Sequence, residues 1–158
     1  MAKSSNSITA SYEALPKILK IIIQILLGSI VGGIFAQVNA EAKNSFTNCW
    51  FDGAITMKGE TARYVGGVVG GVVKGNTTIA HCLNTAPISQ LDFKDAGMFV
   101  GGIVGYIIND KTVGTISDCL NTGKISVNYH VCVGSVVGRL NQAVVTISDT
   151  YATNESYT

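Results

Sequence analysis

The chain has 158 residues, of which 47% are hydrophobic and only 13% are charged, so its composition excludes an intrinsically disordered protein. Its length is that of a single domain. The net charge of +1, without a basic run, argues against a protein that binds nucleic acid through the phosphates. The chain holds 18 glycines against two prolines, and this excess requires an explanation from backbone geometry.

The N-terminal region contains a predicted short strand, Ser7-Ile8-Thr9, followed by an almost wholly apolar stretch from Ile21 to Ala36. Three interpretations of the stretch are open. As a signal peptide, it follows Lys17 and Lys20 and precedes an acceptable cleavage site at residues 38–40. As a membrane helix, it is short for a bilayer. We favour the third interpretation, the first turn of a repeat, which is compatible with a helical cap over residues 12–27.

A glycine-rich block recurs four times along the chain, and its starts are 38, 35 and 33 residues apart. The four copies are Leu27-Gly28-Ser29-Ile30-Val31-Gly32, Val65-Gly66-Gly67-Val68-Val69-Gly70, Val100-Gly101-Gly102-Ile103-Val104-Gly105 and Val133-Gly134-Ser135-Val136-Val137-Gly138. Because each copy recurs together with strand-like landmarks, the glycines are interpreted as tight corners and points of close backbone approach.

Two further landmarks keep their order in every period. The first is a triplet centred on Phe46, Ile79, Ile116 and Ile147, with Ile8 as an earlier member. The second is a triplet centred on Ile55, Ile88 and Ile125, each six residues after a cysteine. Each landmark is short, β-branched and bounded by glycine, asparagine or aspartate, which is typical of a strand.

Three strands per period predict an all-β fold, a right- or left-handed, three-sided parallel β-helix (β-solenoid) of about four turns. Successive turns would stack about 4.8 Å apart, so that equivalent residues form ladders through the core. Residues 1–26 are predicted to form an N-terminal cap or a partial first turn, with a signal-like segment extending to residue 40. Residues 27–158 are predicted to form the repeats, with loops of varying length at residues 57–63, 90–98 and 127–131.

The glycine blocks at 67–70 and 102–105, followed by Thr-Ile-Ser-Asp-Cys-Leu-Asn-Thr-Gly at 115–123, resemble the GLUG-repeat family of bacterial surface proteins. The resemblance covers roughly residues 27–153. The sequence departs from the family pattern where Ser29 and Ser135 replace a glycine and where valine or isoleucine replaces the usual leucine. The resemblance implies an extracellular scaffold, as in adhesins and regions attached to proteases, rather than a defined activity.

The triplets would present a double file of hydroxyl groups, because the residues that flank an inward centre point outward from a strand. Its members are Ser45, Thr47, Thr78, Thr115, Ser117, Thr146 and Ser148, with Ala80 as a gap. A flat threonine array is the surface that solenoid antifreeze proteins present to ice. Serine and threonine are also ordinary solvent-facing strand residues, and we favour that interpretation.

The residues that precede the cysteine positions form a second row, Asn48, His81, Asp118 and Asp149. Stacking would bring Asp118 and Asp149 to about 5 Å, near the carboxylate separation of a retaining glycosidase. These three titratable residues are therefore weak candidates for a catalytic site. A turn rich in aspartate and asparagine is the simpler interpretation.

Buried ladders are the preferred interpretation for two other rows. Asn84 and Asn121 would hydrogen-bond along the axis as a structural ladder. Cys49, Cys82 and Cys119 would stack as small buried hydrophobes, with Cys132 also buried, and the sequence suggests neither a metal site nor a cofactor.

From these patterns we expect a non-enzymatic repeat module of a secreted or cell-surface protein, acting in adhesion or as a rigid spacer. A carbohydrate-binding or polysaccharide-cleaving β-helix is the first alternative, and an ice-binding solenoid is the second. The expected partner is a protein or a glycan on a surface, with no nucleic acid and no membrane span. End-to-end self-association is compatible with the repeat.

Overall fold

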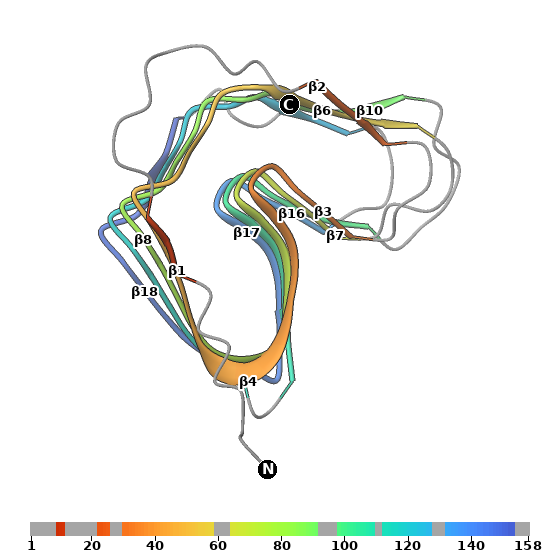
Figure 1. Ribbon diagram of the computed structural model, residues 1–158. Helices are drawn as coiled ribbons and strands as arrows, with labels where there is room; N and C mark the ends of the chain where they lie inside the picture. Colours follow the sequence, from red (N-terminus) through yellow and green to blue (C-terminus); the bar gives the residue numbers. More distant parts are fainter. Residues whose placement is uncertain are drawn as a thin grey trace.

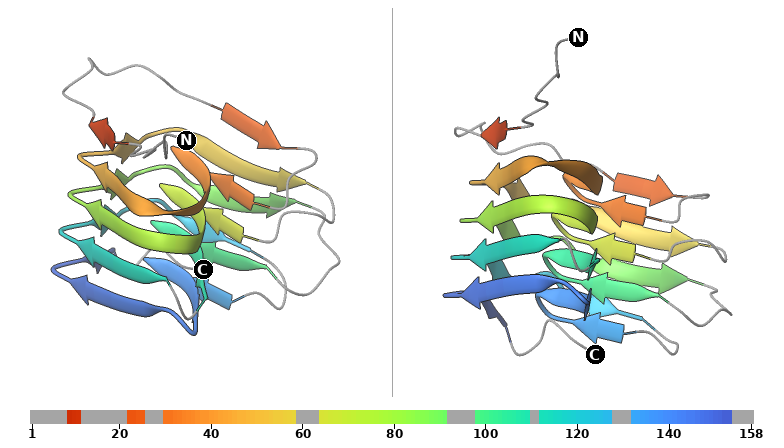
Figure 2. Two further views of the ribbon diagram at one scale, coloured as in Figure 1. Left: turned by 60° about the horizontal axis from the view of Figure 1, so that its bottom comes forward. Right: turned by 90° about the horizontal axis from the view of Figure 1, so that it is seen from below.

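The computed structural model describes residues 9–11, 22–25, 30–58, 64–91, 98–109, 112–127 and 132–153. These residues form parallel strands and no helix, and every strand pair runs in the same direction. Figure 1 looks along the axis, and Figure 2 shows from the side how the turns lie on one another. The predicted all-β solenoid is confirmed.

The turns, called coils below, build four sheets, which we call A to D. Sheet C contains β3 (Ile30–Gly32), β7 (Tyr64–Gly66), β11 (Phe99–Gly101) and β16 (Cys132–Gly134). Sheet A contains β1 (Thr9–Ser11), β4 (Phe35–Thr47), β8 (Val69–Ala80), β12 (Val104–Ile108), β13 (Val113–Ser117), β17 (Val137–Asn141) and β18 (Val144–Ser148). Sheet D contains β5 (Trp50–Phe51), β9 (Leu83–Asn84), β14 (Leu120–Asn121) and β19 (Tyr151–Ala152). Sheet B contains β2 (Ile22–Ile25), β6 (Ala54–Lys58), β10 (Ile88–Leu91) and β15 (Ile125–Ser126).

The described residues form three complete coils, whereas the prediction was about four. Coil 1 runs from β3 to β6, coil 2 from β7 to β10 and coil 3 from β11 to β15. Coil 4, from β16 to β19, has strands in sheets C, A and D, but none in sheet B among the described residues. At the other end, β1 and β2 form a partial coil on coil 1.

The predicted core columns are confirmed by the register of the strands. Ile55, Ile88 and Ile125 pair in sheet B and are fully buried. Phe46, Ile79, Ile116 and Ile147 pair in sheet A. The N-terminal member of this column was predicted wrongly, because Ala10 of β1, not Ile8, pairs with Phe46. Ile8 and Ser7 lie outside the described residues.

The first glycine block was placed four residues too early. Ile30 pairs with Tyr64 and Gly32 with Gly66, so the equivalent of residues 65–70 is residues 31–36 rather than 27–32. The sequence pattern was misleading because Phe35 and Ala36 replace valine and glycine at the end of the true block. Ser29 and Leu27 lie outside the described residues.

The predicted helical cap over residues 12–27 is wrong for Ile22–Ile25, which form strand β2 and pair with β6. Residues 12–21 and 26–27 lie outside the described part of the chain. The possible cleavage site at residues 38–40 lies inside strand β4, where Val38 is buried in the core. Within the described ranges, no helix has the length and apolar character needed to cross a bilayer.

The cross-section is not the triangle that was predicted, because each coil folds back into the interior of the solenoid (Figure 1). The reversal begins where each sheet C strand ends at a glycine that is followed by a second small residue, in the pairs Gly32-Gly33, Gly66-Gly67, Gly101-Gly102 and Gly134-Ser135. At Gly102 a Cβ would lie 2.2 Å from the carbonyl oxygen of Ser135 in the next coil and 2.3 Å from the side chain of Asn121. Only a residue without a side chain allows these approaches.

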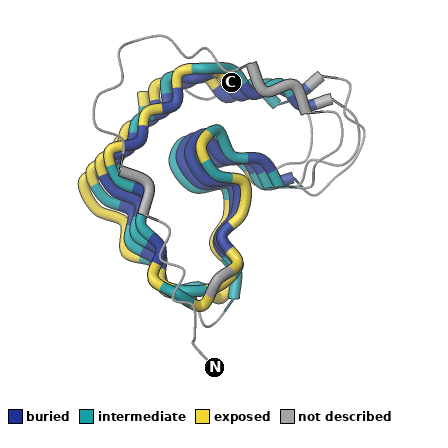
Figure 3. Tube along the Cα trace, viewed as in Figure 1, coloured by how far each residue is buried: buried dark blue, intermediate teal, exposed yellow. Residues whose placement is uncertain are grey.

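The folded-back segment divides the interior into two cores (Figure 3). One core lies between the two halves of sheet A and includes Phe46, Ile79, Ile116 and the three stacked cysteines. The other lies between sheets B and C and includes Ile88, Val100 and Met98. In coils 1 to 3 the inward rows are almost completely buried, so the outward rows of these coils are held by a close-packed wall.

Candidate functional site

The row of predicted catalytic candidates lies at the corner between sheets A and D. Asn48, His81, Asp118 and Asp149 all have a positive φ, between 47° and 56°. This left-handed conformation is uncommon for residues with a side chain, and asparagine, aspartate and histidine are the types enriched in it. The backbone of the corner therefore accounts for the residue types in this row.

The side chains in this row project from the surface. His81 Nδ1 lies 3.9 Å from Asp118 Oδ2, and both side chains are exposed. Asp149 is also exposed and occupies the equivalent position in coil 4. An exposed pair of this kind contributes little to stability. The stacking of the row is as predicted, while its catalytic role stays a prediction.

The predicted hydroxyl files lie in register on the outer face of sheet A. Thr9, Ser45, Thr78, Thr115 and Thr146 form one column. Ser11, Thr47, Ala80, Ser117 and Ser148 form the second column. In coils 1 to 3 the described hydroxyl side chains of both columns are partly exposed, whereas Ala80 and the inward column between them are buried. In coil 4 Thr146, Ile147 and Ser148 are all exposed.

The two stacked asparagines form a buried ladder in sheet D. Asn84 Nδ2 donates a hydrogen bond to Asn121 Oδ1 at 2.8 Å. Each side chain also accepts a hydrogen bond from the backbone amide two residues later, in Ala86 or Gly123, and donates one to the carbonyl of the same residue. Both asparagines are fully buried, so the ladder is structural and has no access to a ligand.

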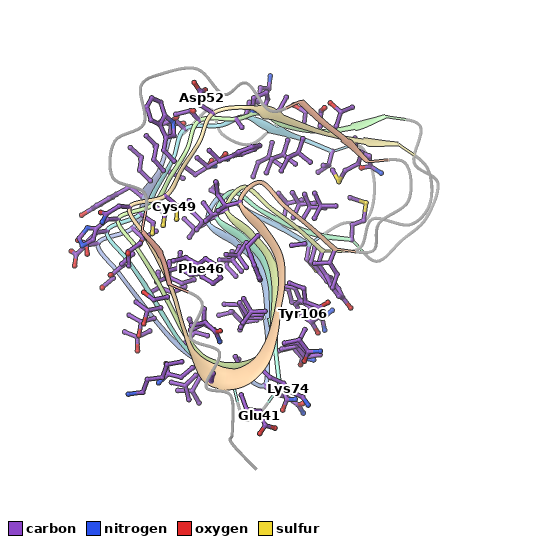
Figure 4. All side chains as sticks on the ribbon, in the orientation of Figure 1. Glu41, Phe46, Cys49, Asp52, Lys74 and Tyr106 are labelled. Carbon is purple, nitrogen blue, oxygen red and sulfur yellow. The ribbon has the colours of Figure 1, made fainter. Side chains whose placement is uncertain are left out.

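The three stacked cysteines form a buried column that faces the core (Figure 4). The thiol of Cys82 donates to the carbonyl oxygens of Ala80 and Phe46 at 3.2 and 3.4 Å. Hydrogen bonding with the Cys119 thiol, then with the Cys49 thiol, and burial raise the pKa of Cys82 far above its usual value. The Cys82 thiol is therefore protonated and unreactive at neutral pH. Cys132 was predicted to be buried, but it is exposed, because it lies in the last coil and in the outward row of sheet C that also holds Tyr64 and Phe99.

Sequence reasoning missed a polar network that fixes an exposed tryptophan. Trp50 Nε1 donates to Thr85 Oγ1 at 3.1 Å, and Thr85 Oγ1 donates to Asp52 Oδ1 at 2.8 Å. Figure 4 shows Asp52 on the outside of the solenoid, opposite the inward-pointing Cys49. The sequence indicates that Trp50 and Leu83 share a row, because both follow equivalent cysteines, but it does not indicate which way that row faces.

An aromatic cluster between sheets C and A was also missed. The rings of Tyr64 and Phe99 stack with centroids 5.7 Å apart, and both contact Tyr106, at 4.6 and 4.9 Å. The guanidinium of Arg139 lies 4.8 Å from the centroid of Phe99. Tyr106 itself is buried and accepts a hydrogen bond from Asn141 Nδ2 at 3.2 Å. The cluster packs coils 2 to 4 against one another.

The described part of the chain contains no group of three or more histidine, cysteine, aspartate or glutamate residues that could hold a metal ion. No family model, curated protein or solved structure matches this chain.

Proposed function

We propose that this chain is a non-enzymatic repeat module of a secreted or cell-surface protein, acting in adhesion or as a rigid spacer. The observation that carries the proposal is the continuous register of the inward rows, which makes the coils one close-packed body. The resemblance to GLUG repeats of bacterial surface proteins supports the same role. A stiff body with long, regular outer faces suits a molecule that presents a surface to a partner.

The dimensions favour presentation of a surface over reach. Each coil adds only about 4.8 Å along the axis, so the described coils together extend roughly 20 Å. A module of this height contributes stiffness to a longer protein rather than length. The adhesive role is therefore the one to test first.

Display of the chain on a non-adherent bacterial host tests the proposal. Cells that carry it should be retained under flow on surfaces coated with glycan or protein, compared with cells that display a flexible Gly/Ser segment of equal length. A spacer would instead extend the reach of a binding domain fused to it. If the chain increases neither retention nor reach, the proposal is wrong.

The enzymatic alternative is a polysaccharide-cleaving site at His81, Asp118 and Asp149. Its support is the 3.9 Å approach of His81 to Asp118 at the corner. Release of reducing ends from a polysaccharide, abolished in Asp118→Asn and Asp149→Asn, would favour this alternative. A release of reducing ends that both variants retain would exclude the site.

Ice binding is a second candidate, supported by the in-register hydroxyl column from Ser45 to Thr146. The gap at Ala80 and the serines weaken the array, because serine lacks the methyl group of threonine. Thermal hysteresis or altered ice-crystal shape, lost in Thr115→Lys and retained in Thr122→Lys beyond the end of strand β14, would support it. Freezing without either effect would exclude it.

A further inference from the structure

An exposed apolar row runs along the outer face of sheet D, parallel to the axis. The row, which we call the Trp50 row, consists of Trp50, Leu83, Leu120 and Tyr151, one residue from each coil. Trp50 and Tyr151, at the two ends, are 50% and 65% exposed. The neighbouring inward residues, Phe51, Asn84 and Asn121, are buried, so the row stands on a rigid wall.

Polar rows flank the Trp50 row on both sides. One consists of Asn48, His81, Asp118 and Asp149 at the corner, and the other of Asp52, Thr85, Thr122 and Thr153. Their hydroxyl, amide, imidazole and carboxylate groups can donate and accept hydrogen bonds. A strip with an apolar centre and polar edges matches a sugar, whose ring faces are apolar and whose rim carries hydroxyl groups.

Trp50 is held in place before any ligand arrives. Its indole N–H is bonded to Thr85, which is bonded to Asp52 in the same coil as the tryptophan. The hydrogen bond leaves the indole exposed while restricting its rotation, so little side-chain entropy remains to be lost on binding. A fixed, exposed indole is a typical anchor of a binding surface.

The spacing of the coils and the charge of the flanking rows restrict the class of ligand that fits the Trp50 row. Coils lie about 4.8 Å apart, close to the rise per residue of an extended β-linked pyranose chain, and the two aromatic ends are about 15 Å apart. Three carboxylates, those of Asp52, Asp118 and Asp149, lie in the flanking rows, and neither row contains a lysine or an arginine. A polyanionic glycan would be repelled.

We propose that the Trp50 row binds a neutral, β-linked polysaccharide strand that lies along the solenoid axis. The inference rests on the proposed adhesive function and names its partner and its surface. Trp50 and Tyr151 stack on sugar rings, and the flanking rows bond to the hydroxyl groups.

The chain's single tryptophan makes its fluorescence a direct report of this surface. Titration with cellohexaose, xylohexaose or chitohexaose should change Trp50 emission in a saturable way for at least one of them. Tyr151→Ala, which leaves the reporter intact, should weaken that affinity about tenfold. Trp50→Ala, followed by calorimetry, should weaken it at least as much. Val113→Ala, an exposed apolar residue on sheet A, is the matched control and should bind as the parent chain does.

Each contrary result overturns the inference. The first is that none of the three oligosaccharides changes the Trp50 emission in a saturable way. The second is that Tyr151→Ala and Trp50→Ala, both with the circular dichroism of the parent chain, bind with unaltered affinity. The third is that the chain binds an oligogalacturonate more tightly than the neutral oligosaccharides. Binding to this row by a protein alone would also overturn it. If displayed cells are still retained on a coated surface in any of these cases, the adhesive function stands and only the glycan assignment fails.

Discussion

Coils 3 and 4 occupy the same register but have opposite surroundings. Ile116 in coil 3 is 1% exposed, whereas Ile147, its partner in coil 4, is 46% exposed. Ile107 and Leu140 show the same contrast, at 2% and 43%. The side chains are equally apolar, so the difference comes from the coil that covers one row and not the other. Burial in this fold is supplied by the neighbouring coil and not by the residue's own coil.

The turn that begins the inward reversal also differs between coil 3 and coil 4, where two residues that contact each other are both replaced. Coils 2 and 3 pair a glycine, Gly67 or Gly102, with a buried asparagine that lies against it. Coil 4 has Ser135 at the glycine position and Ala152 at the asparagine position. The small side chain of Ala152 leaves room for the serine within coil 4. Among the described residues no coil follows coil 4, so no carbonyl oxygen lies against the Cβ of Ser135.

The largest predicted effect comes from transferring the coil 4 residue to coil 3. Gly102→Ser should destabilise the fold by about 3 kcal/mol or more, because its Cβ meets a backbone carbonyl and Asn121. Ser135→Gly is the matched control and should change stability by about 1 kcal/mol or less. Urea denaturation measures both, and similar losses in the two variants would contradict the comparison.

A smaller but clear difference is expected in the isoleucine column. Ile116→Ala should lower the free energy of unfolding by about 3 kcal/mol, because it leaves a cavity in a closed core. Ile147→Ala removes the same atoms from a half-open site and should cost about 1 kcal/mol. Equal losses measured by chemical denaturation would show that Ile147 is covered in solution.

Loss of the asparagine ladder should lower the free energy of unfolding by less than Ile116→Ala and by more than Ile147→Ala. Asn84→Ala should cost about 2 kcal/mol, because the amide and carbonyl of Ala86 and the side chain of Asn121 lose their partner. Thr122→Ala, at an exposed position directly after strand β14, is the control and should have little effect on the melting temperature. A stable Asn84→Ala variant would mean that the ladder is replaceable.

The reactivity of the cysteines should show the difference between coil 4 and the inner coils without any mutation. In the native chain Cys132 should react readily with a thiol reagent, whereas Cys49, Cys82 and Cys119 should react only after unfolding. Labelling followed by mass spectrometry with and without denaturant measures this directly. Rapid native labelling of Cys82 would contradict the buried column.

The stacked columns of this fold were predictable from the sequence, but the folding of each coil back into the interior was not. The spacing of Ile55, Ile88 and Ile125 directly predicts their stacking, because every coil repeats the same short strand. The first glycine block was placed wrongly because two overlapping glycine patterns occur there, and only strand pairing with β7 decides between them. The inward reversal at the end of each sheet C strand depends on contacts with the adjacent coil and with the buried asparagine, which lie far away in the sequence, so local sequence does not encode it.

The candidate sites follow the same rule. Stacking of His81 on Asp118 was predictable from the repeat, while the positive φ that selects these residue types was not read from the sequence. The network from Trp50 to Thr85 and Asp52 joins two coils at the short β5 and β9 strands. Two-residue strands are too short for their alternation to indicate which residue faces outward.

The paired exchange at Ser135 and Ala152 has a consequence for lengthening this protein. A duplicate of residues 98–131, inserted before Cys132, would present a glycine to the coil above it and an asparagine to the coil below. A duplicate of coil 4 would place a serine against its neighbour's carbonyl at every added junction. Duplication of coil 3 is therefore expected to lengthen the solenoid without a clash, whereas duplication of coil 4 is expected to destabilise it.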